Sequence, residues 1–344
     1  MNQLSGKLAS ALMGFVARHF APLLARIIQQ MAATGTGTDA CLRRNCLPVT
    51  VNYYAPIPDL QDLEKRKVWD RRSDLTGIDF GTERQVRVLR GLGQRFGHEC
   101  KWPMESTEDP YQFFTHNPSF SYGCAASLHC ILREYQPQRV IEIGSGNSSL
   151  VISSALNRNT QVTSQVPEYI IIDPYPRPII EHGLPCLTRL VKERVELLEV
   201  GFFDLLRKND VLFVDGGHAV RTGSDVNHMI LDVLPRLAEG VIVHFHDVFL
   251  PFEYPKVWAT NARFRQFWTE AYLLQAFLCL NPDFEILLAM THLMTEQKQA
   301  FQTAFPFYDP IEHPTISGSF WVRRKRVTQS DYEVSSLTTR DEVE

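Results

Sequence analysis

An aspartate and a histidine three residues apart follow an apolar run near the middle of the chain. In VLFVDGGHAV, residues 211–220, the run ends at Asp215, two glycines follow, and His218 comes next. A carboxylate at the end of a buried strand can hold a cation, and a histidine beside it can take up a proton near neutral pH. The glycine pair lets the backbone turn between them. We therefore expect Asp215 to bind a cation and His218 to transfer a proton.

A second carboxylate follows the next apolar run, VIVHFHDV (241–248), which carries His246 and Asp247. Adjacent strands lie about 4.8 Å apart, so Asp215 and Asp247 would be close if the two runs pair or nearly pair. Two such carboxylates repel each other unless a proton or a cation lies between them, and a hard divalent cation prefers oxygen ligands. These residues predict a cation site between Asp215 and Asp247. His246 precedes Asp247 and should point to the opposite side of the strand, unless the strand has already ended. A hydrogen-bonded core or turn histidine is an equally open interpretation of His246.

Two further apolar runs also end in polar residues. The run RVIEIG (139–144) continues into SGNSS, where Gly144 and Gly146 allow a tight turn close to a ligand at the start of a helix. The third glycine of a dinucleotide fingerprint is absent, because Ser149 stands in its place. The run EYIII ends at Asp173, which can accept hydrogen bonds from a ribose diol or can serve only as a turn aspartate. Four polar endings on one sheet edge predict a ligand site.

Strands and helices must alternate to bring these endings together. We expect strands at 139–144, 168–176, 194–200, 210–216 and 241–248, and helices at 82–96, 124–135, 148–158 and 223–240. The strands are too apolar for burial on one face only. This pattern predicts an α/β fold with a mostly parallel sheet and helices on both faces, in which ligands bind at the carboxyl ends of the strands.

The remaining segments suggest a division of the chain. Residues 1–38 contain no acidic residue and predict an amphipathic helix, kinked at Pro22. This helix could pack on this or another subunit, lie on a membrane surface, or act as a targeting segment. Residues 39–120 are expected to form an N-terminal cap or extension, 121–326 the main domain, and 327–344 a disordered tail.

Composition excludes some function classes. The net charge is −4 and the pI is near 6.3, so no global basic field favours nucleic acid, and RRKR (323–326) is best interpreted as a solvated strand end. The seven cysteines are odd in number and contain no C-x-x-C pair, which is typical of reduced thiols in a cytosol. We expect a cytoplasmic protein, and contact with a membrane surface through its N-terminal helix is an open alternative.

The motifs RVIEIGSGNSS, IIIDPYP, VLFVDGGH and GVIVHFHDVF, in this order and spacing, resemble class I S-adenosylmethionine-dependent methyltransferases. The D-G-x-H and H-D endings are similar to a bacterial branch that includes macrolide sugar O-methyltransferases. The resemblance covers about residues 121–323. It implies a Rossmann-like sheet of seven strands, the last two at 284–290 and 318–324, one of them antiparallel.

The resemblance also implies roles for particular residues. Cofactor-binding residues would be Glu142, Gly144, Ser145, Gly146, Asn147, Asp173, Asp204 and Asp215, with Asp173 on the ribose and Asp204 beside the adenine. His218 would be the catalytic base, and Asp215, His246 and Asp247 would hold Mg²⁺ or Mn²⁺. This chain departs from those relatives at His246, where they carry a carboxylate, and an imidazole favours softer metals.

These inferences predict O-methylation of a small-molecule or sugar hydroxyl with S-adenosyl-L-methionine as cofactor, assisted by a divalent cation. The acceptor would lie beneath residues 249–258, and the candidate walls from the N-terminal segment are Tyr53, Tyr54, Trp69, Arg71 and Arg72. Two alternatives remain open: a methyltransferase-like protein that binds the cofactor without methyl transfer, and an NAD-linked oxidoreductase. A homo-oligomer is a further open expectation.

Overall fold

A computed structural model describes residues 2–262 and 265–325 of the chain. By its internal contacts the chain divides into two compact units. The smaller unit comprises residues 1–68 and 259–267, and the larger unit comprises residues 69–258 and 268–344. The larger unit therefore contains residues 69–120 of the predicted extension and all of the predicted main domain except residues 259–267. The predicted tail, 327–344, lies outside the described residues, and the assignment of domains stays a prediction.

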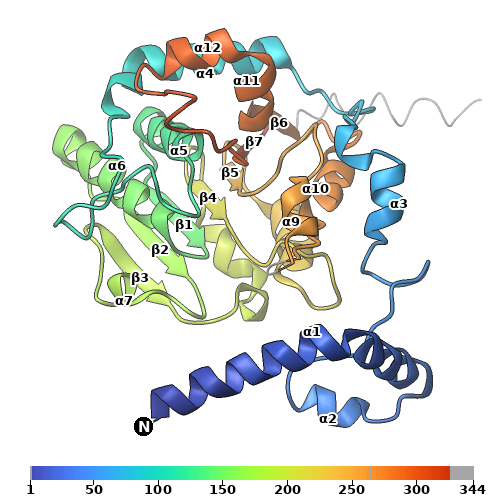
Figure 1. The fold of residues 1–344 in the computed structure, drawn as a ribbon. Helices are drawn as coiled ribbons and strands as arrows, with labels where there is room; N and C mark the ends of the chain where they lie inside the picture. Colours follow the sequence, from blue (N-terminus) through green and yellow to red (C-terminus); the bar gives the residue numbers. More distant parts are fainter. Residues whose placement is uncertain (1, 263–264, 326–344) are drawn as a thin grey trace, which may run out of the picture. The chain divides into compact units, whose positions relative to one another are not determined.

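The larger unit is built on one seven-stranded sheet (Figure 1). Its strands are β1 (Arg139–Ile143), β2 (Glu168–Ile172), β3 (Leu187–Val191), β4 (Val211–Val214), β5 (Ile242–Phe245), β6 (Phe284–Ala289) and β7 (Phe320–Arg324). The spatial order is β3-β2-β1-β4-β5-β7-β6. β7 is antiparallel to both β5 and β6, and the other pairs are parallel. The predicted Rossmann-like α/β fold is confirmed.

The helices of the chain vary widely in length. They are α1 (Asn2–Thr34), α2 (Thr38–Leu42), α3 (Leu60–Lys65), α4 (Thr82–Phe96), α5 (Tyr122–Tyr135), α6 (Asn147–Thr163), α7 (Pro178–Glu181), α8 (Asp225–Asn227), α9 (Lys256–Thr260), α10 (Glu270–Leu278), α11 (Met290–Glu296) and α12 (Lys298–Ala304). The predicted helix over 223–240 is α8 followed by a π-helical turn, His228–Val233, and a 3₁₀ turn. No helix among the described residues is both long and apolar enough to cross a membrane.

Alternation along the strands creates a core on each face of the sheet. Val140 and Phe213 point into one core with α4, α5, α6 and α12, whereas Ile141 and Leu212 point into the other with the π-helical turn and α10. Both faces are covered, so the central strands are buried at every position after the first. Burial on both faces explains why these strands read as continuous apolar runs.

The third predicted strand is wrong. The segment 194–200 forms a 3₁₀ turn, Val195–Leu197, and the edge strand β3 lies earlier, at Leu187–Val191. An edge strand pairs on one side only, and the side chains of Thr188 and Arg189 are exposed. β3 therefore lacks the apolar run that identified the other strands.

Glu99, in the segment after α4, forms a cluster of charged groups with His129 and Arg133 of helix α5. Glu99 accepts hydrogen bonds from His129 Nε2 at 2.8 Å and from Arg133 Nε at 3.0 Å. Burial opposes ionisation of Glu99, but the bonds from His129 and Arg133 outweigh it and lower the pKa of the carboxyl to about 2. Glu99 is therefore a carboxylate at every ordinary pH.

Glu99→Gln is expected to destabilise the protein by about 2 kcal/mol at pH 7, because Arg133 then loses its charged partner in a buried place. The folded pKa lies below the ordinary value of 4.5. The stabilisation is thus present above pH 4.5 and is lost as the pH falls towards 2. Urea unfolding at pH 7 and pH 4 measures it. Glu83→Gln on the exposed face of α4 is the matched control, and an equal loss in both variants would contradict the prediction.

Candidate functional site

The strand order reverses between β1 and β4, and the two strand ends lie against each other there. Asp215 N donates to Ile143 O at 2.9 Å, and a Cβ on Gly144 would lie 2.0 Å from the carbonyl oxygen of Asp215. Gly144 also has φ +75°, a conformation that side chains disfavour. Only glycine therefore lets the two chain ends meet at the point where open α/β sheets bind ligands.

The turn after β1 is tied to the end of β2. Asp173 Oδ2 accepts hydrogen bonds from Ser145 N at 2.9 Å and from Ser145 Oγ at 2.5 Å, and Asp173 Oδ1 accepts one from Tyr175 N at 2.7 Å. These bonds fix the orientation of the carboxylate. Oδ2 accepts two bonds, so Oδ1 is the oxygen that keeps a lone pair for a further donor. The predicted residues Gly144, Ser145 and Asp173 are thus brought together.

The start of α6 leaves space beside this turn. A Cβ on Gly146 would meet only Arg177 Nη2, at 3.9 Å, so the backbone there is open to a ligand. Asn147, the first residue of α6, donates through Nδ2 to Asn117 Oδ1 at 2.8 Å and to Ser119 Oγ at 2.9 Å. The N-terminus of α6 is thereby held in place next to an open turn.

Glu142 lies behind the turn, with no exposed surface. Its carboxyl accepts hydrogen bonds from Ser148 Oγ at 2.6 Å, from Ser149 Oγ at 2.9 Å and from the Tyr169 hydroxyl. Burial raises the pKa of Glu142 to about 7, although the three hydroxyl donors oppose the shift. Glu142 therefore holds the start of α6 behind the turn through hydrogen bonds. The contact with a cofactor that the resemblance implied stays a prediction.

Asp204 does not directly follow a strand, although the sequence predicted that it would. Its assignment depended on a third strand at 194–200, which the structure replaces with β3 at 187–191. Asp204 is exposed and belongs to a 3₁₀ segment, Val200–Leu205. The residues that directly follow β3 are Lys192 and Glu193, and Asp173 N donates to Val191 O at 3.0 Å. The region beside Asp173 is therefore the end of β3.

His218 lies between two carboxylates. Its Nε2 is 3.2 Å from Asp215 Oδ1, and its Nδ1 is 2.9 Å from Glu270 Oε2. The ring packs on Trp268 with centroids 4.2 Å apart, and only 6% of the side chain is exposed. The backbone of His218 has φ +55° and its carbonyl accepts from the Thr269 and Glu270 amides. The imidazole is therefore fixed at both nitrogens and on one face.

Charge determines the protonation of this group. Burial disfavours the charged ring, but Asp215 and Glu270 raise the pKa of His218 well above its usual range. Burial likewise opposes ionisation of Asp215, yet His246 and His218 outweigh it and lower the pKa of Asp215 to about 2. Asp215 is thus an anion beside a protonated ring as long as no other cation is present.

Asp247 completes a group that can hold a metal ion. One possible ligand atom from each of Asp215, His218 and Asp247 lies within 4.8 Å of the others. This confirms that the two strand-end aspartates are close. The group differs from the predicted metal set because His218 takes the place of His246.

His246 lies beside this group, buried against Phe120 at 5.1 Å between ring centroids. Its Nε2 is 3.6 Å from Asp247 Oδ1, and its Nδ1 has no hydrogen-bond partner among the described residues. Burial opposes protonation, but Asp247 and Asp215 raise the pKa of His246 to about 9. His246 therefore interacts electrostatically with both aspartates.

Glu270 is the site residue that the sequence analysis missed. It is the first residue of α10, 52 positions after His218, and 1% of its surface is exposed. In the sequence FWTEAYLL it reads as an ordinary acidic residue in the first turn of a helix. No local signal distinguishes it, because only the packing of α10 brings it to the imidazole.

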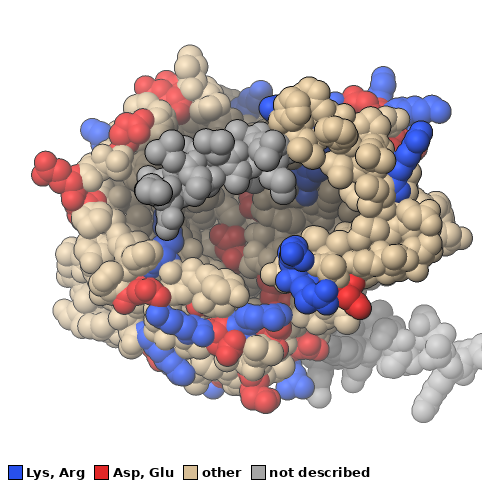
Figure 2. All heavy atoms as spheres, turned by 60° about the horizontal axis from the view of Figure 1, so that its bottom comes forward, with Lys and Arg blue, Asp and Glu red and all other residues tan. Residues whose placement is uncertain are grey.

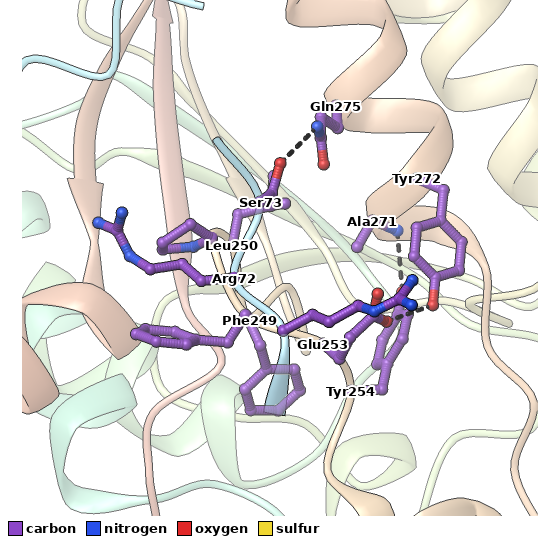
Figure 3. A pocket seen from close by; sticks show the side chains of 12 residues that line it. Arg72, Ser73, Phe249, Leu250, Glu253, Tyr254, Ala271, Tyr272 and Gln275 are labelled. Atoms are coloured by element: carbon purple, nitrogen blue, oxygen red, sulfur yellow. Dashed lines mark hydrogen bonds between the residues drawn. The ribbon is translucent and has the colours of Figure 1, made fainter. Parts of the chain in front are cut away.

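A pocket of about 220 Å³ is lined by residues that are close in sequence to Asp247 and Glu270. Figure 3 shows its walls: the loop after β5 with Phe249, Glu253 and Tyr254, the start of α10, and the segment of Arg72 and Ser73. Three hydrogen bonds hold the walls together: Gln275 to Ser73 at 2.9 Å, Ala271 N to the Tyr254 hydroxyl at 2.8 Å, and Tyr272 to Glu253 at 2.6 Å. Phe249 follows Asp247 by two residues, and Ala271 follows Glu270. The pocket is therefore lined by chain neighbours of two site residues, whereas Asp215, His218, Asp247 and Glu270 are not themselves among its lining residues.

Two of the five residues expected as acceptor walls line this pocket. Arg71 and Arg72 both line the pocket, and Arg72 also pairs with Glu296 at 3.0 Å. Figure 2 shows Lys and Arg interspersed with Asp and Glu over the face that it displays. The pocket lining combines aromatic rings with two arginines and one glutamate.

Comparison with known proteins finds a similarity in the central segment. Residues 141–248, less than half of the chain, match the profile described as "Methyltransferase domain". An uncharacterized protein of Archaeoglobus fulgidus is 28% identical over 166 residues, which cover 46% of this chain and 73% of that protein. The matched segment begins in β1 and ends after Asp247, so it contains the glycine turn, Asp173 and His218.

Two solved structures show weaker similarity. A putative protein-L-isoaspartate O-methyltransferase from Plasmodium falciparum, in complex with S-adenosyl-L-homocysteine, is 15% identical, with 54% of this chain and 81% of that chain covered and a TM-score of 0.28. A putative methyltransferase from Thermobifida fusca is 13% identical, with 75% and 97% covered and a TM-score of 0.36. At these scores neither match carries an argument of its own. The segment 141–248 is thus similar to a methyltransferase domain, and this similarity supports a methyltransferase.

Proposed function

We propose that this protein transfers the methyl group of S-adenosylmethionine to a hydroxyl oxygen of a small molecule or sugar. One observation carries the proposal: an open glycine turn beside Asp173 and the Asp215–His218–Asp247 group lie on the same edge of the sheet. The first feature suits a nucleoside with a charged tail, and the second suits a hydroxyl that must lose a proton. The methyltransferase-domain match over 141–248 supports the same function.

The cofactor would lie along the ends of β1 and β2. Asp173 would accept hydrogen bonds from the ribose diol, with its carboxylate already oriented by Ser145. Gly146 leaves room for close approach, Gly144 lets the ends of β1 and β4 meet, and the amide groups at the start of α6 favour a carboxylate. When bound, S-adenosylmethionine supplies the activated methyl group. The chain contributes binding and orientation.

The acceptor proton would go to His218. Glu270 holds Nδ1, so Nε2 is the nitrogen that faces Asp215 and the acceptor side. Both carboxylates favour the protonated ring, so a base role requires their charge to be offset. A divalent cation held by Asp215 and Asp247 would do this, and Mg²⁺ or Mn²⁺ suits two carboxylates. His246 stays a predicted third ligand.

The pocket shown in Figure 3 is our candidate for the acceptor. Phe249, Tyr254 and Tyr272 supply ring faces, and Arg71 and Glu253 supply polar groups at the wall. Burial raises the pKa of both tyrosines far above the ordinary value, so their hydroxyls stay neutral. Such walls suit an acceptor that has both apolar and hydrogen-bonding groups.

Calorimetric titration of the protein with S-adenosylmethionine and, separately, with NAD⁺ tests the proposal, each with and without Mg²⁺ or Mn²⁺. We expect binding of S-adenosylmethionine at micromolar concentration and a loss of affinity of about 10- to 100-fold in Asp173→Ala, because a ribose hydrogen bond to a charged group is removed. Asp232→Ala, an exposed aspartate beside His228, is the control. Binding of NAD⁺ in place of S-adenosylmethionine would favour an oxidoreductase and overturn the proposal.

A further inference from the structure

Within the smaller unit, helix α1 exposes an apolar face, which we define as Phe20, Leu23, Leu24, Ile27 and Ile28. The exposed fractions of these side chains are 49%, 55%, 38%, 46% and 45%. The helix is 33 residues long and continues through Pro22. Large apolar side chains of this exposure, adjacent on one helix, mark a surface that another surface covers.

The apolar face is wide and continuous. At about 100° per residue, its five members fall within an arc of about 140°, whereas Arg18, Arg26, Gln29 and the exposed Phe15 fall outside it. The seam of a two-helix coiled coil is narrower than this arc. An arc of this width suits a helix that lies flat in the plane of an interface.

The charge of the same segment is of one sign. Residues 1–38 contain Lys7, Arg18 and Arg26 and no Asp or Glu. Two copies of α1 packed together would bring cations together with no acidic partner on either helix. A negatively charged lipid surface attracts the same cations, at about 1 kcal/mol for each one near the surface.

We propose that α1 lies on an anionic lipid surface, with its apolar face buried among the acyl chains at the headgroup boundary. The helix does not cross the bilayer, because it is not apolar enough to do so. The function of this contact is to bring the enzyme to the membrane surface, and it does not depend on the methyl-transfer reaction. The contact has two independent components, apolar burial and charge, which can be removed separately.

Flotation of the full-length protein with vesicles tests this proposal. We expect binding to vesicles of phosphatidylcholine with one-third phosphatidylglycerol, and binding at least about tenfold weaker to phosphatidylcholine alone. Ile27→Glu should weaken partition to the anionic vesicles on the order of tenfold or more, because it places a charge in the apolar face. Gln29→Glu adds the same charge on the opposite side of the helix and should lose much less.

Other results would overturn the proposal. Equal losses in Ile27→Glu and Gln29→Glu would show that charge alone matters, and the apolar face would not be the contact. Failure of the wild-type protein to float with anionic vesicles would do the same. A dimer in sedimentation that Ile27→Glu dissociates, without vesicle binding, would assign the face to a second copy. Circular dichroism of each variant excludes loss of the helix as the cause.

Discussion

His218→Gln should lower kcat/KM for methyl transfer by about 10³-fold, which corresponds to about 4 kcal/mol of lost transition-state stabilisation. Glutamine keeps polarity and approximate size but cannot accept the acceptor proton. Asp215 and Glu270 would remain on either side of it, 3.2 Å and 2.9 Å from where the ring nitrogens were. Release of S-adenosylhomocysteine with a hydroxyl acceptor measures the rate, and calorimetry with S-adenosylmethionine should show unchanged affinity.

A variant of Glu270 distinguishes the role of His218 as the base from the role of Glu270 in orienting it. Glu270→Gln retains one hydrogen bond to Nδ1 but removes the negative charge, and we expect a loss of about 10- to 100-fold in kcat, smaller than that of His218→Gln. If His218→Gln retained most of the wild-type rate while cofactor binding was intact, the base assignment would be wrong. A second candidate base would then have to be found among the described residues around Asp247.

Gly144→Ala should destabilise the folded protein by at least about 3 kcal/mol and abolish cofactor binding. The added Cβ would lie 2.0 Å from the carbonyl oxygen of Asp215, which is backbone and cannot rotate away. The left-handed conformation at φ +75° adds about 1 kcal/mol or more of strain for alanine. The ends of β1 and β4 would have to separate, and these ends carry the site. Urea unfolding and calorimetry measure the two effects.

Gly223→Ala is the matched control for Gly144→Ala. Gly223 also has a positive φ, +66°, but nothing lies within 4 Å of the Cβ that alanine would add. This variant should therefore show the backbone strain alone, about 1 kcal/mol, and normal affinity for S-adenosylmethionine. Equal stability of the two variants would mean that the ends of β1 and β4 are not in close contact in solution.

The apolar runs and their polar endings were sufficient to predict the central sheet. β1, β2, β4 and β5 all lie within the predicted ranges, because strands buried on both faces leave a continuous apolar signal. Helix α4 has the predicted bounds, Thr82–Phe96, because its leucines and valines recur at helical spacing. The edge strand β3 was missed because pairing on one side leaves Thr188 and Arg189 exposed.

The sequence by itself determined the candidate chemistry: an aspartate at the end of each of three strands, a histidine after a glycine pair, and a glycine turn. These residues lie next to their strands along the chain, so local pattern was enough to find them. Only the tertiary structure decided which of them meet. Asp215, His218 and Asp247 converge because β4 and β5 pair in parallel and end at one edge.

Two further outcomes depended on packing alone. Glu142 belongs to the glycine motif, yet three hydroxyls hold its carboxyl in the core behind the turn. Glu270 belongs to no motif, yet α10 places it 2.9 Å from His218 across 52 residues of chain. Hydrophobic periodicity identifies which face of an element is buried. It carries no information on which polar groups from distant elements meet, because that depends on how the elements pack together.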